Sequence, residues 1–507
     1  MWDQYVTSFG LIATPEIILS IAAGVLGGLF VGAMPGLTST MAIALMVPVT
    51  FAMEPAHGLS LLMGVYCGGI SGGFVASCLL NIPGTPSSAA TCLDGYPMSK
   101  NGQAPRALAL AGYSSILGGC LSGLCLVVIA PTLADFALRF GPWEYFALVI
   151  FTFSCVSSLS SGSTLKSFIA AGLGLLLALV GTDPTNGVTR FTFGIEDLES
   201  GFDVMPALIG VFAVPQLLED IDEIGIEAHL IEARIKASDY LAAAKEIWHR
   251  KIDLLRSTLI GIVVGILPGV GPGLSNVVAY AQARTASKTP EKFGEGVLAE
   301  AIIAPESANN ASMGGAMIPL LTLGIPGDAS TLMMLGAFML HNIQPGPLLF
   351  RDNGDIVYAI FIAYFIAFAF LLVFLHFCLR PIIKAIVIPA QFMIPVLLVL
   401  CTIGCFSLNN RMFDVYCFLA FGLFGYVLKQ FKYPLLPVIL GLILGHMAEQ
   451  QLRLSLTLSS GSLAPFFTRP ISLVLLAISL ISLLLPFYVE RRHRNRKLAA
   501  AVVPGEH

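Results

Sequence analysis

Four short polar segments, each starting at a proline–glycine pair, hold the side chains best able to bind a ligand in this 507-residue chain. Proline breaks a helix, and glycine permits the turn after which a helix restarts. The restarted helix offers free N–H groups to an anion, whereas exposed carbonyls and an acid suit Na⁺ or H⁺. We predict anion binding here; the alternative is simple kinks. The candidate substrate-binding residues are Pro35, Gly36, Thr38, Ser39, Asn81, Thr85, Ser87, Ser88, Gly269, Gly271, Ser275, Asn276, Ser330 and Thr331.

The four segments form two matched pairs. The pattern G-x-x-x-G-x-x-P-G at 28–36 returns at 261–269, and the Ile-Pro-Gly segment at 82–88 returns at 325–331. The shared order predicts two structural repeats, which we expect to be inverted. Glycines four residues apart allow close helix packing, and packing alone could explain them. Broken helices at matching positions of two halves are nevertheless the sequence signal of a transporter's midplane binding site.

Acidic and amide side chains near these segments are candidates for binding a coupling ion. Asp328 directly follows the second Ile-Pro-Gly, and Glu306, Asn309 and Asn310 share one helical face. An acid inside a membrane is a functional hypothesis by default. For Glu306 the alternative is a helix end among the headgroups. Asp94, close to a lysine, is expected in a solvated turn.

Enzymatic function is the main rival hypothesis. The G-x-S-G around Ser71 matches intramembrane serine proteases, but a serine nucleophile needs a histidine base. His341, His376 and His446 have no spacing that recommends them, and packing explains the neighbouring glycines. A membrane-embedded enzyme using Ser71 or Asp328 and a passive channel remain the alternatives. The chain has no HExxH and no phosphate loop, so zinc proteolysis and ATP hydrolysis lack their residues. We expect no enzyme activity, and no cofactor beyond Na⁺ or H⁺.

The composition places these segments in a membrane. Hydrophobic residues make up 56% of the chain and charged residues 11%, against about 25% charged in soluble proteins. The net charge of −4 gives no electrostatic case for nucleic acid. We predict an all-α polytopic fold in the lipid bilayer, with half-helices or re-entrant hairpins at the midplane. The candidate spans are 10–31, 58–80, 107–133, 143–160, 165–181, 203–219, 254–267, 311–325, 354–379, 388–407, 413–428, 434–447 and 469–488.

Charge divides the chain into four parts: a first transmembrane repeat at 1–220, a polar amphipathic connector at 221–252, a second repeat at 253–490 and a basic tail at 491–507. Basic loops remain in the cytoplasm, so the connector and the tail are expected there. The first 99 residues contain no Lys or Arg, which predicts an outside N-terminus. In the connector, Leu241 and Trp248 belong to the expected apolar face. These assignments give the halves odd and even crossing numbers, so strict inversion needs one more helix or one reassigned segment.

Several motifs together resemble one family. They are GAMPGL at 32–37, NIPGTPSS at 81–88, LDGYPM at 93–98, GILPG at 265–269, APESANN at 304–310, GIPG at 324–327 and HNIQPGP at 341–347. The sequence resembles the large transmembrane subunit of the tripartite tricarboxylate transporters over about residues 10–480. It differs at Asp328, where the family often carries a small residue such as serine.

The resemblance implies a multi-pass protein of the bacterial inner membrane that imports carboxylates by cation symport. It also implies two partners, a small four-helix membrane subunit and a periplasmic solute-binding protein. The particular carboxylate, the choice between Na⁺ and H⁺, and the oligomeric state, with a dimer as one option, stay open.

Overall fold

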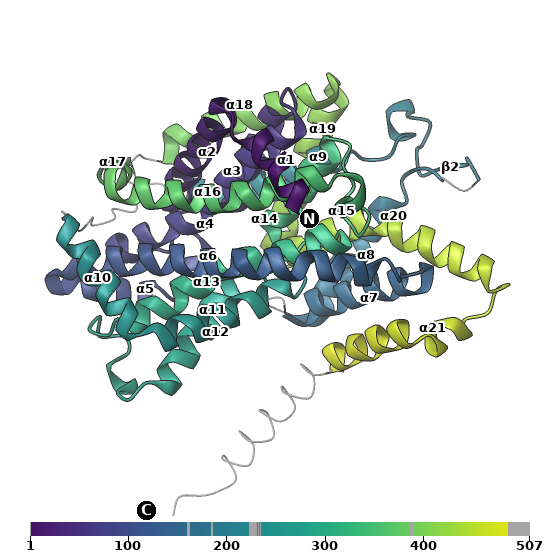
Figure 1. Cartoon of the computed structure of the whole chain (residues 1–507). Coiled ribbons are helices and arrows are strands. Elements are labelled where there is room, and N and C mark those ends of the chain that lie inside the picture. Colours follow the sequence, from purple (N-terminus) through teal and green to yellow (C-terminus); the bar gives the residue numbers. More distant parts are fainter. Residues whose placement is uncertain are drawn as a thin grey trace, which may run out of the picture. The chain divides into compact units, whose positions relative to one another are not determined.

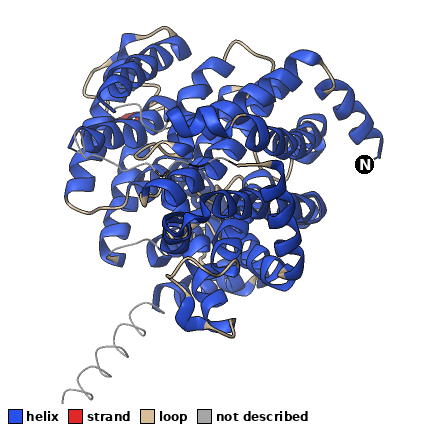
Figure 2. Ribbon diagram, turned by 90° about the vertical axis from the view of Figure 1, so that its left-hand side faces the viewer, coloured by secondary structure: helices blue, strands red, loops and turns tan. Residues whose placement is uncertain are grey.

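Helices make up almost the whole of the computed structural model (Figure 2). It describes residues 2–159, 163–183, 186–222, 231, 233, 235–385 and 390–484. In chain order the elements are α1 (Trp2–Ile12), α2 (Pro15–Ala33), α3 (Ser39–Thr50), α4 (Pro55–Leu80), η1 (Pro86–Ser88), α5 (Cys92–Met98), η2 (Ser99–Gln103), α6 (Ala104–Ala137), α7 (Pro142–Leu159), α8 (Thr164–Ala178), β1 (Gly181–Thr182), β2 (Thr189–Arg190), η3 (Glu196–Leu198), α9 (Val204–Asp222), α10 (Ala237–His249), α11 (Lys251–Ile266), α12 (Gly271–Ala286), η4 (Pro290–Lys292), α13 (Glu300–Leu323), α14 (Ala329–Leu340), α15 (Leu349–Asp352), α16 (Gly354–Phe377), α17 (Leu379–Ala385), α18 (Ala390–Asn409), α19 (Met412–Gln430), α20 (Leu435–Leu458) and α21 (Ala464–Thr468).

Six helical segments in the described part of the chain are long and apolar enough to cross a membrane. They are Pro15–Ala33, Pro55–Leu80, Cys92–Ala137, Gly354–Phe377, Met412–Gln430 and Leu435–Leu458. The expectation of an all-α, multi-pass membrane protein is therefore confirmed. β1 and β2 form a two-stranded antiparallel hairpin that pairs Gly181 with Arg190.

The described residues form two compact units. One contains Met1–Leu138 and Met205–Tyr426, and the other contains Arg139–Val204 and the described part of Val427–His507. This grouping reflects packing and not repetition, so the division into 1–220, 221–252 and 253–490 stays a prediction. The basic tail at 491–507 lies outside the described residues.

Two helix pairs in the first unit approach through glycines. α2 packs on α4, where Gly28 and Gly32 face the backbone of Val65 and Gly69. α11 packs on α13, where Gly261 and Gly265 face the backbone of Ala308 and Ser312. A methyl group at any of these four glycines would overlap a carbonyl oxygen of the facing helix. The glycines are thus needed for packing.

The helix paths are interrupted where proline–glycine pairs follow these glycines. α2 ends at Ala33 and α3 starts at Ser39; Gly36, between them, has a φ of +87°. α11 ends at Ile266 and α12 starts at Gly271, with Gly269 at a φ of +76°. Side chains with a Cβ rarely adopt this left-handed region. Glycine therefore lets the chain turn at both positions.

The connector helix α10 buries a different face from the expected one. Tyr240, Ala243 and Ile247 are buried, and α10 packs against α6, where Arg106 pairs with Glu246. Leu241 and Trp248 are 72% and 70% exposed. The side of α10 that packs on the protein is therefore offset by one position from the apolar face with Leu241 and Trp248, and a membrane-surface position of that face stays a prediction. Part of the connector, including Leu230, lies outside the described residues.

A network of ion pairs joins the hairpin to α20 in the second unit. Arg190 pairs with Glu449 at 2.8 Å, and Arg453 pairs with Glu449 at 2.6 Å and with Asp183 at 2.9 Å. Asp183 is buried. The network attaches the loop between α8 and α9 to α20.

Candidate functional site

Asp328 is the centre of the first polar cluster in the first unit. Its Oδ1 accepts hydrogen bonds from the backbone N–H and the hydroxyl of Thr331, both at 2.6 Å. Its Oδ2 accepts one from the Tyr66 hydroxyl at 2.9 Å. We define the Asp328 cluster as Ser39, Thr40, Tyr66, Asp328, Ser330 and Thr331. Both carboxylate oxygens thus have donors, and Asp328 caps the N-terminus of α14.

The Asp328 cluster joins segments almost 300 residues apart. The Ser330 hydroxyl shares hydrogen bonds with those of Ser39, at 2.9 Å, and Thr40, at 3.2 Å. Ser39 and Thr40 open α3 after the first proline–glycine pair, and α3 packs on α14 (Figure 1). The first proline–glycine segment is therefore in contact with the last one.

Glu306 is the centre of a second cluster. Its Oε1 accepts a hydrogen bond of 2.5 Å from Thr91, and its Oε2 accepts one of 2.9 Å from Ser115. Asn276 donates to the Thr91 hydroxyl at 3.4 Å and to the Pro305 carbonyl at 3.2 Å. We define the Glu306 cluster as Thr91, Ser115, Asn276, Glu306 and Asn309. Residues from α6, α12, α13 and the segment before α5 meet here.

The two remaining breaks also meet. The backbone N–H of Ala90 donates to Asn276 at 2.7 Å, and α12 packs on η1. Ser275 donates to the carbonyls of Pro272 and Ala308. A Cβ added at Gly271 would lie 2.9 Å from the Asp328 Cβ, so the start of α12 touches the Asp328 cluster as well.

The hydroxyls of the first Ile-Pro-Gly segment mostly bond one another. Thr85 and Ser87 share a hydrogen bond of 2.6 Å, and Ser88 bonds Ser77 at 2.9 Å. Asn81 lies apart from them: it is exposed and ends α4 with a φ of +60°. Thr38 caps α3 by accepting from the Met41 N–H. Pro35 and Gly36 are partly buried in the turn before it.

The amide residues near Glu306 differ in their hydrogen bonding. Asn310 accepts from the Ser71 hydroxyl at 2.7 Å and donates to the Glu306 carbonyl. Asn309 is fully buried. Its side chain interacts with the Glu306 carboxylate, yet neither its nitrogen nor its oxygen makes a hydrogen bond of normal geometry. Asn309 is therefore the amide with spare bonding capacity.

Both buried acids lack a basic partner within the described ranges. Asp328 is 4% exposed and Glu306 is fully buried, and no Lys or Arg described by the structure pairs with either. An ionised acid away from water needs an opposite charge or a proton. Glu306 lies six residues inside α13 and is fully buried, so it is not an exposed acid at the end of a helix.

Sequence reasoning missed Tyr66, Thr91 and Ser115, and it misplaced Asp94. Asp94 is fully buried. It accepts hydrogen bonds from the Tyr280 hydroxyl at 2.8 Å and from the N–H groups of Gly294 and Gly296 at 2.9 Å. The expected solvated turn is wrong, because donors about 200 residues away replace water. The sequence around Asp94 gave little sign of this burial. The glycines at 294 and 296, whose N–H groups it binds, lie far away in the chain.

Replacing Asp94 by alanine is expected to destabilise the protein strongly. Two backbone N–H groups and the Tyr280 hydroxyl would lose their acceptor, and each buried unpaired donor costs about 1–3 kcal/mol. Thermal unfolding of the purified protein measures the loss. Tyr280→Phe removes one donor and leaves Asp94 in place, so it should lower the melting temperature less. Equal melting temperatures for wild type and Asp94→Ala would contradict this role.

Ser71 is hydrogen-bonded to an amide. Its hydroxyl donates to Asn310, and His376, one of the three candidate bases, bonds Tyr113. The side chain of Ser71 thus connects α4 to α13. This geometry supports a packing role for the G-x-S-G.

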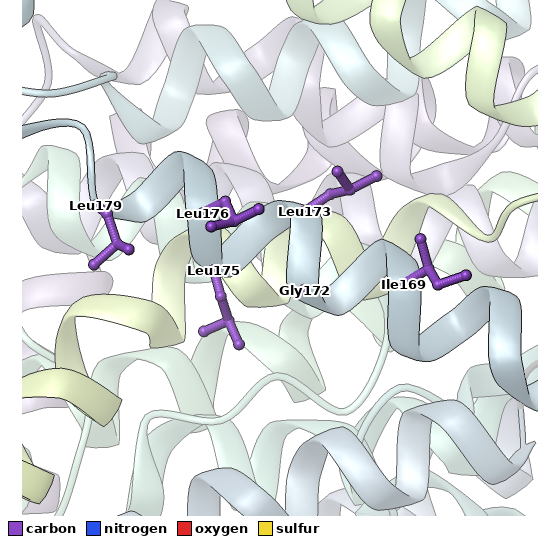
Figure 3. A pocket seen from close by; sticks show the side chains of 6 residues that line it. All are labelled: Ile169, Gly172, Leu173, Leu175, Leu176 and Leu179. Atoms are coloured by element: carbon purple, nitrogen blue, oxygen red, sulfur yellow. The ribbon is translucent and has the colours of Figure 1, made fainter. Parts of the chain in front are cut away.

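An apolar pocket in the second unit offers no site for an anion. It is lined by Ile169, Gly172, Leu173, Leu175, Leu176 and Leu179 (Figure 3). All six belong to α8 or its end, and Leu176 is 60% exposed. No side chain of this set can donate a hydrogen bond to a carboxylate.

Helices long and apolar enough to cross a membrane, interrupted next to buried polar clusters, define a polytopic membrane protein. A family described as the tripartite tricarboxylate transporter TctA family matches residues 18–440. The chain belongs to this family, as the motifs in the sequence indicated.

Two relatives from Agrobacterium vitis support the assignment. One, named "Uncharacterized 52.8 kDa protein in TAR-I ttuC' 3'region", is 36% identical over 487 residues, which is 96% of each chain. Another, "Uncharacterized protein in TAR-II ttuC' 3'region", is 37% identical over 212 residues, 42% of this chain and 87% of the relative. No solved structure matches. Membership places the chain in a family of transporter subunits.

Proposed function

We propose that this protein is the large permease subunit of a binding-protein-dependent secondary transporter, which imports carboxylates by cation symport across the bacterial inner membrane. The observation that carries the proposal is the meeting of all four proline–glycine segments in one buried polar region. Ser39 meets Ser330, and Ala90 meets Asn276. Unwound backbone at membrane depth is stable only where it faces protein or a cavity.

Matching contacts support two structural repeats within this permease, which we propose to be inverted. Gly32 faces Gly69 in the first half, and Gly265 faces Ser312 in the second. Gly84 adjoins the Gly32 carbonyl, as Gly327 adjoins that of Gly265. These contacts join the same motif positions in each half. Inverted repeats favour a rocking or elevator movement around a central site, by analogy with other transporters.

The substrate carboxylate is proposed to bind among hydroxyls, amides and helix N-termini of the four segments. α3 and α12 start there, and their N–H groups favour an anion, whereas Asp328 already caps the N-terminus of α14. The residues are those inferred from the sequence: Pro35, Gly36, Thr38, Ser39, Asn81, Thr85, Ser87, Ser88, Gly269, Gly271, Ser275, Asn276, Ser330 and Thr331. The tips touch, with Ser39 only 2.9 Å from Ser330. Binding then requires the tips to separate.

A coupling cation is proposed to offset the buried acids. Asp328, Glu306, Asn309 and Asn310 are the candidates. Oxygen ligands suit Na⁺, and a carboxyl could instead take a proton. Either ion would compensate the cost of a negative charge in a membrane, about 2.5–3.5 kcal/mol on insertion scales.

Two further subunits are proposed: a small four-helix membrane protein and a periplasmic solute-binding protein. No described Lys or Arg pairs with the acids of either cluster. A multiply charged anion therefore finds little long-range attraction here. A soluble protein that captures the anion would supply the missing affinity. The proposal leaves a monomer or a dimer open.

Uptake is expected to require the soluble partner. The test reconstitutes this subunit in proteoliposomes with the two proposed partner subunits, and follows labelled di- and tricarboxylates under an inward Na⁺ or H⁺ gradient. At micromolar substrate we expect uptake to fall at least tenfold without the binding protein. Uptake that is equal with and without it would contradict partner dependence, and passive equilibration without a gradient would favour a channel.

A further inference from the structure

The Glu306 cluster contains a buried amide without a hydrogen-bond partner, Asn309, and the Asp328 cluster has no such amide. Asp328 receives three hydrogen bonds from Thr331 and Tyr66 and caps α14. Glu306 receives two, both from hydroxyls, although it is fully buried. Both carboxyls lack a basic partner among the described residues, so the two clusters differ in the amide of Asn309 and not in charge.

Asn309 supplies the second, independent observation. It lies one turn after Glu306, is fully buried and interacts with that carboxylate. Its amide oxygen and nitrogen nevertheless have no hydrogen-bond partner of normal geometry. Buried amides are almost always satisfied, and an unsatisfied one points to a missing water or ion. An oxygen ligand for a hard cation is thus held beside a buried carboxyl group.

We propose that Glu306 and Asn309 bind the coupling Na⁺, with the hydroxyl oxygens of Thr91 and Ser115 beside it, whereas Asp328 has a structural role. This inference rests on the proposed cation symport and assigns its ion. Carboxylate, amide and hydroxyl oxygens are ligands that suit hard cations. A monovalent ion neutralises one carboxylate, so no further acid is required.

The position of Thr91 explains how the ion would act on the substrate. Thr91 closes the segment that starts with Thr85 and Ser87, the proposed carboxylate-binding hydroxyls. The same segment is attached to α12 by the bond from Ala90 to Asn276. An ion that holds Thr91 against Glu306 orders the segment before substrate arrives. By linkage, Na⁺ must then raise carboxylate affinity, and carboxylate must raise Na⁺ affinity by the same factor.

Thermal unfolding of the purified full-length protein tests the Na⁺ site without substrate or partners. The melting temperature is followed as NaCl replaces choline chloride at constant ionic strength. A ligand that binds only the folded state raises it with concentration. We expect Na⁺ to raise it for wild type and for Asp328→Asn, and to leave it unchanged for Glu306→Gln and Asn309→Ala. Choosing Asn309→Ala as a second variant keeps the test valid should Glu306→Gln fold poorly.

Three outcomes would overturn the assignment: an undiminished Na⁺ shift in both Glu306→Gln and Asn309→Ala, a shift lost only in Asp328→Asn, or a wild type that responds to pH and not to Na⁺. The last would identify a proton as the ion. Because no uptake is measured, these results are independent of whether carboxylate import itself is observed. Binding of ²²Na⁺ to the same variants provides a second readout. We expect the Na⁺ affinity of Glu306→Gln to be at least tenfold lower than that of wild type.

Discussion

Gly32→Ala and Gly265→Ala will each abolish uptake and sharply reduce the yield of folded protein. A methyl group at Gly32 would overlap the Gly69 carbonyl oxygen, and one at Gly265 would overlap that of Ser312. The obstacle in each case is backbone in a fully buried helix, which cannot move aside as a flexible side chain can. Overpacking of this kind typically costs about 1–3 kcal/mol or more. Size-exclusion profiles, melting temperature and reconstituted uptake measure the effect.

Gly27 provides the matched control. It lies in the same helix, α2, next to Gly28, and a Cβ there meets no atom within 4 Å. Gly27→Ala should keep wild-type yield and uptake. Its melting temperature should rise slightly, because alanine has a higher helix propensity than glycine. Comparable damage from Gly27→Ala and Gly32→Ala would mean that helix flexibility, and not close packing, explains the glycines.

The sequence was sufficient to mark these glycines as possible packing positions, because that information is local. A G-x-x-x-G pattern marks one face of one helix, and the proline–glycine pair after it marks where the helix stops. α2 and α11 end one residue before Met34 and Leu267, just ahead of Pro35 and Pro268. The apolar composition likewise required a membrane fold. Neither inference needs knowledge of which distant segment is the neighbour.

Partners across the chain could not be predicted, and they decide the site. Tyr66 sits in an apolar helix with no local sign of a role, yet it donates to Asp328, 262 residues away. Asp94 looked solvated because its sequence neighbours are polar, whereas Tyr280 and two glycine N–H groups surround it. Burial of a polar side chain is set by the fold around it. The hydrogen-bond donors around each acid therefore had to be known before Asp328, a helix cap, could be distinguished from Glu306, a candidate ion ligand.

Gly36→Val and Gly269→Val are expected to reduce uptake at least tenfold while the protein still folds and inserts. Both residues have a positive φ, +87° and +76°, where a β-branched side chain is strained. Such strain costs about 1–3 kcal/mol. The turn can relieve it only by shifting the start of α3 or α12, which carry Ser39 and Asn276. The proposed carboxylate site would then be misaligned.

Gly102→Val separates strain from position. Gly102 has a similar φ of +79°, is exposed, and a Cβ there meets no atom within 4 Å. The same substitution therefore adds comparable strain away from both polar clusters, and uptake should stay near the wild-type level. Initial uptake rates, normalised to inserted protein, are compared for the three variants. If Gly102→Val loses as much uptake as Gly36→Val, the loss comes from general destabilisation, and the turns have no special part in binding the carboxylate.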